Sequence, residues 1–228
     1  MAALKNKFEI SVIIPTLNEE ECIARCIRSF HDHEAVREII VCDGGSKDRT
    51  QQIASSFSKV RWVEVERGRA SQMNHGAKCA TSDILIFLHA DTYIQSRALS
   101  SVNAALQGNI AGSFYLEFDK PGKLLAFYSK LSKINSSLFT YGDQGLFIRR
   151  EKFMELDGFK NMPIMEDYDM VVRLHKLGKF IKLPHPAITS ARRFMKHGVV
   201  RQQLLNIILV FLYQLGVKPE VLSRFYRY

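Results

Sequence analysis

A histidine and an aspartate follow an apolar run near the middle of the chain. Residues 84–88 read ILIFL and predict a buried strand, and His89 and Asp91 come directly after it. Side chains two positions apart on a strand point to the same side, so we expect both residues to face one site. A carboxylate there suits Mg²⁺, which takes one or two protein carboxylates together with substrate phosphates. His89 could contact the cation, a phosphate or only its neighbours.

Two further groups of acidic residues could act on a substrate. Asp43 ends a second apolar run and precedes Gly44 and Gly45, where a carboxylate can accept hydrogen bonds from a ribose or a base. Asp43 could instead cap the helix that follows. Glu166 and Asp167 stand at a predicted helix start, where a carboxylate can take a proton from an incoming hydroxyl. A charged first helical turn is the simpler alternative for this pair.

Basic residues are concentrated in the last quarter of the chain. The net charge is +9, and residues 170–228 hold 11 Lys and Arg against a single acid, Glu220. The segment 192–197, RRFMKH, precedes a very apolar helix predicted for 199–216. Such a distribution suits phosphates, whether in a nucleotide, a nucleic acid or an anionic membrane. A solvated basic surface is the alternative.

The elements that must position these residues alternate in the first half of the chain. Strands are predicted at 8–14, 37–43, 60–66 and 83–91, with a helix beginning near Asn18, a helix running to about Phe57, and a helix after Arg67. This alternation indicates a parallel, open α/β sheet, in which ligands bind beyond the carboxyl ends of the strands. Polar loops at 16–19, 43–46, 67–74 and 89–92 would then share one edge.

The second half is less regular. A strand is predicted at 111–118, helices near 122–139 and 166–179, and a short strand followed by a helix that ends near Gly158. We find no repeat, linker or low-complexity tract. The sequence therefore predicts one α/β domain: a mostly parallel open sheet, flanking helices and a C-terminal apolar helix.

The cysteines and the N-terminus bear on location. Cys22, Cys26, Cys42 and Cys79 lack the paired spacing of a zinc site, and no long apolar segment precedes the first strand. We expect four reduced thiols in a cytoplasmic protein.

The motifs, taken in order, resemble those of family 2 glycosyltransferases of the GT-A fold. They are SVIIPTLNEE, IIVCDGGSKDRT, GRASQMNHGA, ILIFLHADT, GDQGLFIRR, MEDYDMVVRLHKLGK and SARRFMKHG, spread over about residues 9–217. More narrowly, the chain is similar to a small bacterial subgroup with an LHADT form of the metal motif. The resemblance implies transfer of a sugar from a nucleotide diphosphate sugar to a hydroxyl acceptor, with inversion at the anomeric carbon. It also implies Mg²⁺ or Mn²⁺ as cofactor.

The resemblance implies a role for each matching position. It assigns metal binding to Asp91, with His89 beside it, and general base catalysis to Asp167, with Glu166 as its neighbour. The implied donor-binding residues are Pro15, Leu17, Glu19, Asp43, Arg69, Asn74, Gln144, Arg192 and Arg193. Gly142 and Asp143 would lie with Gln144 by the donor or acceptor sugar. The domain 1–228 would comprise a nucleotide-binding half at 1–112, an acceptor half at 113–198 and a C-terminal apolar and basic helical segment at 199–228.

The chain departs from the family pattern in two ways. The usual metal motif is acid–any–acid, but here the first position is His89. The Q-x-x-R-W box of processive synthases is also absent, which favours an enzyme that makes single transfers.

The sequence leaves several alternatives open. One is a pseudoenzyme that binds nucleotide sugars without transferring them. Another is a nucleic-acid-binding module, for which the aromatics among the basic residues are too few, so we expect no nucleic acid partner. The helix at 199–216 either lies on the inner face of the membrane, as a peripheral contact with a lipid-linked acceptor, or packs on the core or in a homodimer interface.

Overall fold

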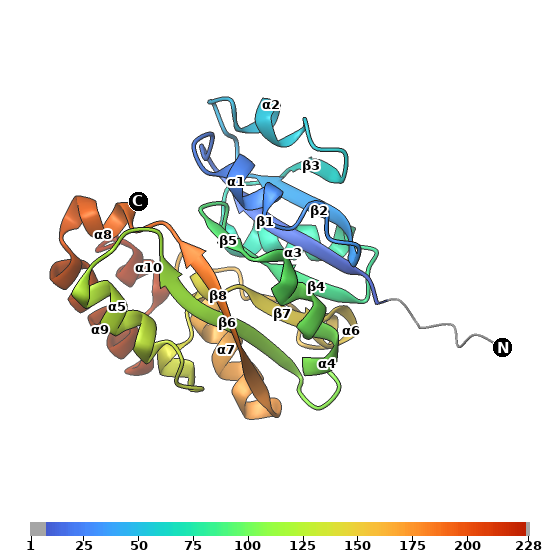
Figure 1. Cartoon of the computed structure of the whole chain (residues 1–228). Coiled ribbons are helices and arrows are strands. Elements are labelled where there is room, and N and C mark those ends of the chain that lie inside the picture. Colours follow the sequence, from blue (N-terminus) through green and yellow to red (C-terminus); the bar gives the residue numbers. More distant parts are fainter. Residues whose placement is uncertain (1–7, 227–228) are drawn as a thin grey trace.

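A computed structural model describes residues 8–226; residues 1–7, which carry most of the N-terminal segment discussed above, and residues 227–228 lie outside the described part. One eight-stranded sheet runs through the molecule in the order β3-β2-β1-β4-β7-β6-β8-β5 (Figure 1). The strands are β1 (Ile10–Thr16), β2 (Val36–Asp43), β3 (Val60–Glu64), β4 (Ile84–Phe87), β5 (Thr92–Ile94), β6 (Ala111–Phe118), β7 (Leu146–Arg149) and β8 (Phe180–Thr189).

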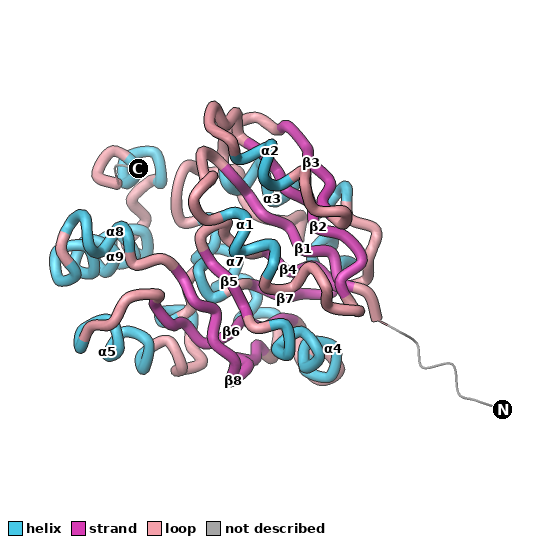
Figure 2. The backbone as a smooth tube through the Cα atoms, turned by 45° about the horizontal axis from the view of Figure 1, so that its top comes forward, coloured by secondary structure: helices cyan, strands magenta, loops and turns pink. Residues whose placement is uncertain are grey.

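Helices cover both faces of this sheet (Figure 2). They are α1 (Ile23–Arg28), α2 (Thr50–Ala54), α3 (Arg69–Cys79), α4 (Val102–Ala105), α5 (Lys123–Leu131), α6 (Arg150–Glu155), α7 (Glu166–Leu177), α8 (Arg192–His197), α9 (Val199–Gln214) and α10 (Pro219–Ser223). Short 3-10 helices are η1 (Ser96–Ser101), η2 (Ser137–Phe139) and η3 (Gly142–Gln144).

The predicted α/β class with a mostly parallel sheet is confirmed. Strands β3, β2, β1 and β4 are parallel neighbours, and β6 pairs in parallel with β8. The remaining pairs, β4 with β7, β6 with β7 and β5 with β8, are antiparallel. Antiparallel pairing of β7 with β4 brings the loop before β7 to the same edge as the carboxyl ends of β1 and β4.

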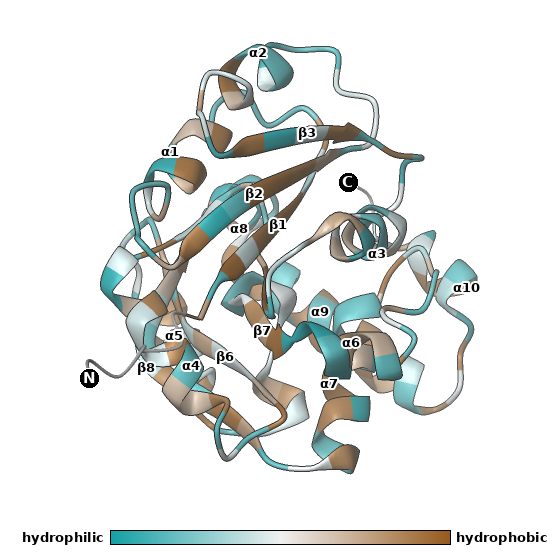
Figure 3. Cartoon of the chain, turned by 90° about the vertical axis from the view of Figure 1, so that its right-hand side faces the viewer, coloured by the Kyte–Doolittle hydropathy of each residue, from teal (hydrophilic) through white to brown (hydrophobic). Residues whose placement is uncertain are grey.

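Alternation along the strands divides the core into two layers. On β1, Ile10, Val12 and Ile14 pack into the layer that contains α1, whereas Ile13 faces the layer that contains α3 and α7. All these side chains are fully buried, as expected for parallel strands covered on both faces. In Figure 3 the hydrophobic stretches, in brown, run along the strands of the sheet.

A third, smaller apolar cluster joins the C-terminal helices to the body. Ile164, Leu209 and Leu222 form its buried centre. Helices α5, α8, α9 and α10 lie together on one side of the molecule (Figure 1). Within residues 8–226, no helix combines the length and the apolar composition that crossing a bilayer requires.

Four local predictions need correction. The helix predicted near 122–139 ends at Leu131, and η2 follows as a separate short helix. The helix predicted from Asn18 begins at Ile23, because the backbone amides of Asn18, Glu19 and Glu20 are bound by the side chains of the loop 46–50 instead. Helix α2 is short and ends at Ala54 rather than near Phe57. The strand predicted through residue 91 ends at Phe87.

Candidate active site

A cleft of about 860 Å³ opens at the carboxyl edge of β1 and β4. One wall is formed by Pro15 at the end of β1, by Leu17 and Glu19 in the loop that follows it, and by Arg69 of α3. The opposite wall comes from α7, α8 and α9. Loops far apart in the sequence therefore converge on one cleft. This is the expected place, because ligands of open α/β sheets bind beyond the carboxyl ends of the strands.

His89 and Asp91 lie in a turn between β4 and β5. The amide of Thr92 donates to the carbonyl of His89 at 3.0 Å and closes this turn. The strand argument for their shared direction is therefore wrong, since strand geometry ends two residues earlier. Both side chains nevertheless line the cleft, because the turn directs them there.

His89 connects two carboxylates. Its Nδ1 lies 2.8 Å from Oδ1 of Asp143, and its Nε2 lies 3.6 Å from Oδ2 of Asp167. Burial would lower the pKa of His89, but its hydrogen bonds to Asp143 and Asp167 outweigh burial and raise the pKa to about 10. The imidazole is thus a cation at neutral pH in this arrangement, and it neutralises part of the negative charge of the cleft.

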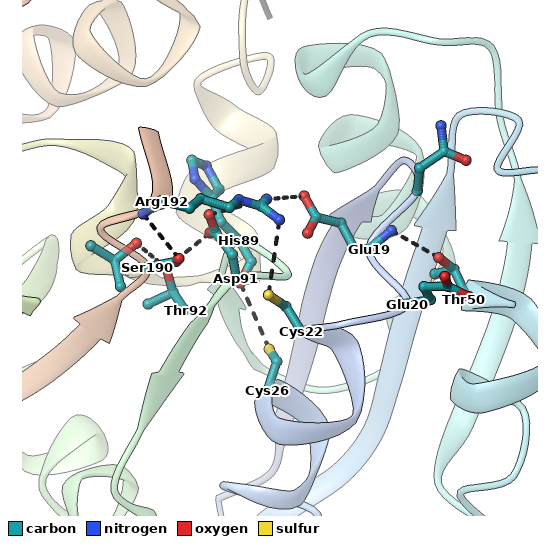
Figure 4. A network of polar contacts seen from close by, with 12 residues as sticks. Glu19, Glu20, Cys22, Cys26, Thr50, His89, Asp91, Thr92, Ser190 and Arg192 are labelled. Carbon is teal, nitrogen blue, oxygen red and sulfur yellow. Dashed lines mark hydrogen bonds and ion pairs between the residues drawn. The ribbon is translucent and has the colours of Figure 1, made fainter. Parts of the chain in front are cut away.

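Asp91 faces a second cation, the guanidinium of Arg192. Nη2 of Arg192 lies 3.3 Å from Oδ2 of Asp91 and also donates to Oε1 of Glu19. Figure 4 shows Arg192 reaching from its helix towards Glu19, above Asp91 and Cys22. Arg192 therefore joins α8 to two loops at the carboxyl edge of the sheet.

Three side chains could hold a metal ion. One ligand atom each from His89, Asp91 and Asp143 lie within 4.8 Å of one another. Burial, and after it the charge of Asp143, raises the pKa of Asp91, so a bound cation would relieve the repulsion between these carboxylates. Carboxylates suit Mg²⁺ and Mn²⁺, and an imidazole nitrogen suits Mn²⁺ better than Mg²⁺. The donor set fits a divalent cation.

The first turn of α7 supplies Glu166 and Asp167 in opposite environments. Met165, just before the helix, has a left-handed backbone with φ of 71°, a conformation that bulky residues seldom adopt. Glu166 is fully buried, and its Oε1 lies 2.7 Å from Nε of Arg69; burial raises the pKa of this carboxyl. Asp167 lines the cleft, and its contact with His89 outweighs burial and holds its pKa below the ordinary value.

Three of the predicted binding residues do not line the cleft. Asp43 is buried, and its carboxylate accepts hydrogen bonds from the amides of Gly45 and Ser46 and from the Ser46 hydroxyl. Asp43 thus organises the turn after β2, and it does not cap α2, which begins only at Thr50. Asn74 holds the backbone of Phe159 through both ends of its amide, at 2.7 and 2.9 Å.

Gln144 is also buried. Its Nε2 donates to the carbonyl of Phe139 at 2.8 Å, and its Oε1 accepts from the hydroxyl of Ser113. The side chain thus supports the turn that presents Asp143 rather than the cleft itself. Arg193 does line the cleft, where its guanidinium lies 4.6 Å from the centre of the Tyr226 ring.

The sequence did not predict a site role for the polar residues of α9. Gln202, Gln203 and Asn206 line the cleft, and Nε2 of Gln202 donates to Oδ1 of Asn206 at 2.9 Å. Their spacing was the available signal, since polar residues at i, i+1 and i+4 share one side of an otherwise apolar helix.

The chain is similar to a known protein family, to individual relatives and to solved structures. The profile described as "Glycosyl transferase family 2" matches residues 11–168. The probable glycosyltransferase YdaM of Bacillus subtilis is 24% identical over 216 residues, which cover 82% of this chain and 51% of that protein. The chain thus spans about half the length of this relative.

A second relative is the GalNAc(5)-diNAcBac-PP-undecaprenol beta-1,3-glucosyltransferase of Campylobacter jejuni. It is 24% identical over 223 residues, covering 90% of this chain and 71% of that protein.

Solved structures share the fold at low sequence identity. Staphylococcus aureus TarS, determined with UDP-GlcNAc, has a TM-score of 0.66 and 18% identity, over 80% of this chain and 58% of that one. The mannosyltransferase PcManGT of Pyrobaculum calidifontis, determined with GDP-Man and Mn²⁺, has a TM-score of 0.64 and 21% identity, over 79% and 56% of the two chains.

Proposed function

The chain belongs to glycosyl transferase family 2, and from this premise we propose that it transfers a sugar from a nucleoside diphosphate sugar to a hydroxyl group in single steps, with inversion at the anomeric carbon. The observation that carries the proposal is the convergence of Glu19, Asp91, Asp143, Asp167 and Arg192 on one cleft. A volume of about 860 Å³ lies within the usual range of ligand pockets.

Inverting displacement needs a base on one face of the anomeric carbon and a stabilised leaving group on the other. Asp167 is proposed as the base, since it is an ionised carboxylate that lines the cleft. His89 contacts Asp167 and orients its carboxylate. General base catalysis is commonly worth about 10²–10⁴-fold in rate.

The leaving diphosphate is proposed to bind on the side of Asp91 and Arg192. Asp91 and Asp143 would hold Mg²⁺ or Mn²⁺, with His89 as a third ligand only in its neutral form, and the bound cation would neutralise charge that develops on the diphosphate. Arg192, now paired with Glu19 and Asp91, supplies a guanidinium suited to bidentate phosphate contact. The complexes of TarS with UDP-GlcNAc and of PcManGT with GDP-Man and Mn²⁺ support a donor and a cation of this kind.

The acceptor is proposed to be a lipid-linked alcohol at the inner face of the membrane. Support comes from the Campylobacter relative, whose name describes an undecaprenol-linked acceptor, and from the apolar residues of α9 near the cleft. The division into a nucleotide half at 1–112, an acceptor half at 113–198 and a C-terminal segment at 199–228 stays a prediction.

Replacing the proposed base tests the function. Release of nucleoside diphosphate from a panel of nucleotide sugars with Mn²⁺ should fall by about 10²-fold or more in Asp167→Asn. Donor binding, measured as a rise in melting temperature with ligand, should stay near that of the parent protein.

Asp32→Asn is the matched control, because that side chain is 97% exposed. Full turnover by Asp167→Asn would remove Asp167 from the base role. Donor binding without turnover of any donor by the parent protein would instead support the pseudoenzyme alternative.

A further inference from the structure

Helix α9 buries two glutamines together with Leu209 and leaves a row of large apolar residues exposed. Gln202 and Gln203 are only 4% and 9% exposed and line the cleft, whereas Leu204 and Phe211 are 54% and 57% exposed. The exposed large apolar residues of α9, together with Leu215, which follows it, recur at helical spacing: Val200, Leu204, Ile207, Ile208, Phe211 and Leu215. A helix that packs on a core normally does the reverse. An exposed apolar row of this kind is typical of a surface that binds an apolar partner.

Neighbouring helices extend this side into a broader surface. Leu124 and Phe127 of α5, Met195 of α8, and Val221 and Phe225 in and after α10 are exposed as well. These helices gather on one side of the molecule (Figure 1). We name the exposed apolar residues of α5, α8, α9 and α10 the outer face. Apolar surface gathered on one side of a molecule is typical of interaction sites with proteins or membranes.

The segments that carry the outer face are rich in basic residues and contain almost no acidic ones. Exposed basic residues on and between these helices are Lys123, Lys130, Lys133, Lys196, Arg201, Lys218 and Arg224. In the described segments 120–140 and 192–226, Glu220 is the single acidic residue. On α5, Lys123, Phe127 and Lys130 occupy positions i, i+4 and i+7, so cations and an aromatic ring share one side.

This charge distribution favours an anionic bilayer over a second copy of the chain as the partner of the outer face. A second copy of the chain would bring two basic surfaces together, which costs free energy through like-charge repulsion. An anionic bilayer is complementary instead: its headgroups attract lysine and arginine, and its acyl boundary accepts leucine, isoleucine and phenylalanine. Long basic side chains can also extend to the headgroups while their stems remain in apolar contact.

We propose that the outer face docks on an anionic lipid bilayer, with α9 lying in the plane of the interface. The inner side of the same helix lines the cleft, so docking brings the cleft next to the bilayer surface. The inference rests on the proposed function in one respect, namely that the bilayer carries the acceptor. Docking itself is independent of turnover.

Vesicle flotation tests docking with the full chain. The protein should float with phosphatidylcholine vesicles that contain phosphatidylglycerol, and much less with phosphatidylcholine alone. Leu204→Glu should lower the bound fraction about tenfold, because it places a charge where apolar area would be buried. Leu177→Glu is the matched control, since Leu177 lies on α7 outside the outer face and is 57% exposed. It should float like the parent protein.

Other outcomes would overturn the inference. These are equal flotation with both kinds of vesicle, flotation of Leu204→Glu at the parent level, or no flotation at all. A dimer in sedimentation that Leu204→Glu dissociates, together with no flotation, would identify a second copy as the partner. Asp167→Asn separates the two proposals: it should float normally, so its loss of turnover reports on the reaction alone.

Discussion

His89 stands where the resemblance to the family leads one to expect an acid, and its contacts fit the site around a cation instead. It lies between Asp143 and Asp167, which come from separate segments of the chain. As a cation it offsets their repulsion and ties the turn η3 to the start of α7. A histidine at this position can therefore organise the cleft whether or not it also binds a metal ion.

Gly142 allows Asp167 to reach His89. A Cβ atom added at Gly142 would lie 2.1 Å from Oδ2 and 2.6 Å from Cγ of Asp167, so the carboxylate would have to move. We predict that Gly142→Ala lowers turnover by about 10²-fold, because misplacement of a reacting group by about 1 Å has costs of that size. Steady-state kinetics measures the effect.

Gly108→Ala is the control for this substitution, since nothing lies within 4 Å of a Cβ atom at Gly108. It should retain parent activity. Normal turnover in Gly142→Ala would show that Asp167 does not need its present position.

Asp91 belongs to the three residues that could hold a cation. We predict that Asp91→Ala weakens Mn²⁺-dependent binding of a nucleoside diphosphate by about tenfold or more, because a carboxylate ligand is lost. Calorimetric titration of UDP and GDP with and without Mn²⁺ measures it. Asp32→Ala should bind like the parent; identical titrations for Asp91→Ala would remove Asp91 from the cation site.

At the scale of the elements, a buried lysine fixes two helices to the sheet. Nζ of Lys182, on β8, donates to the carbonyls of Ser132 at the end of α5 and Phe139 at the end of η2. Cations are favourable at helix C-termini, where carbonyls lack partners. Burial nevertheless lowers the pKa of Lys182 to about 7. The same side chain thus supports the position of α5 and makes its support depend on pH.

The sign of the pH dependence of stability follows from the pKa values of Lys182 in the folded and unfolded chain. The folded-state pKa of about 7 lies below the ordinary value of 10.5, so the unfolded chain binds more protons between these pH values. The free energy of unfolding should therefore rise with pH across this window, by at most about 1.4 kcal/mol per pH unit. Lys182→Met should lack this rise. Urea unfolding of both proteins between about pH 7 and about pH 9 measures it.

Lys179→Met, which replaces an exposed lysine near the start of the same strand, should keep the parent slope. Equal slopes for the parent and Lys182→Met would contradict the prediction.

Elements with strong apolar patterns were predictable, and side-chain partners were not. The run 84–88 predicts a buried strand correctly, since five consecutive apolar residues leave little choice. Asp43 and Asn74 carry polar groups that can bind either a ligand or the backbone, and the sequence cannot tell which. In the structure both hold the backbone. The turn that contains His89 and Asp91 could not be predicted, because the apolar run does not show at which residue the strand ends.

At the scale of the whole molecule, the order of the motifs was sufficient for the family and the α/β class. The mixed strand pairing in the second half of the sheet could not be predicted, because β7 and β6 join the sheet through contacts between residues distant in sequence. The orientation of α9 was also beyond prediction: its apolar pattern shows that one side must be covered, but not whether the protein itself covers it.

One side of helix α9 lines the cleft and the other side is exposed, and this has a mechanical consequence. Because a helix moves as a nearly rigid rod about 10 Å across, a tilt that seats Leu204 and Phe211 also shifts Gln202 and Gln203. If the outer face docks as proposed, attachment and turnover share this helix. Rate constants measured with anionic vesicles should then differ from those measured in plain buffer.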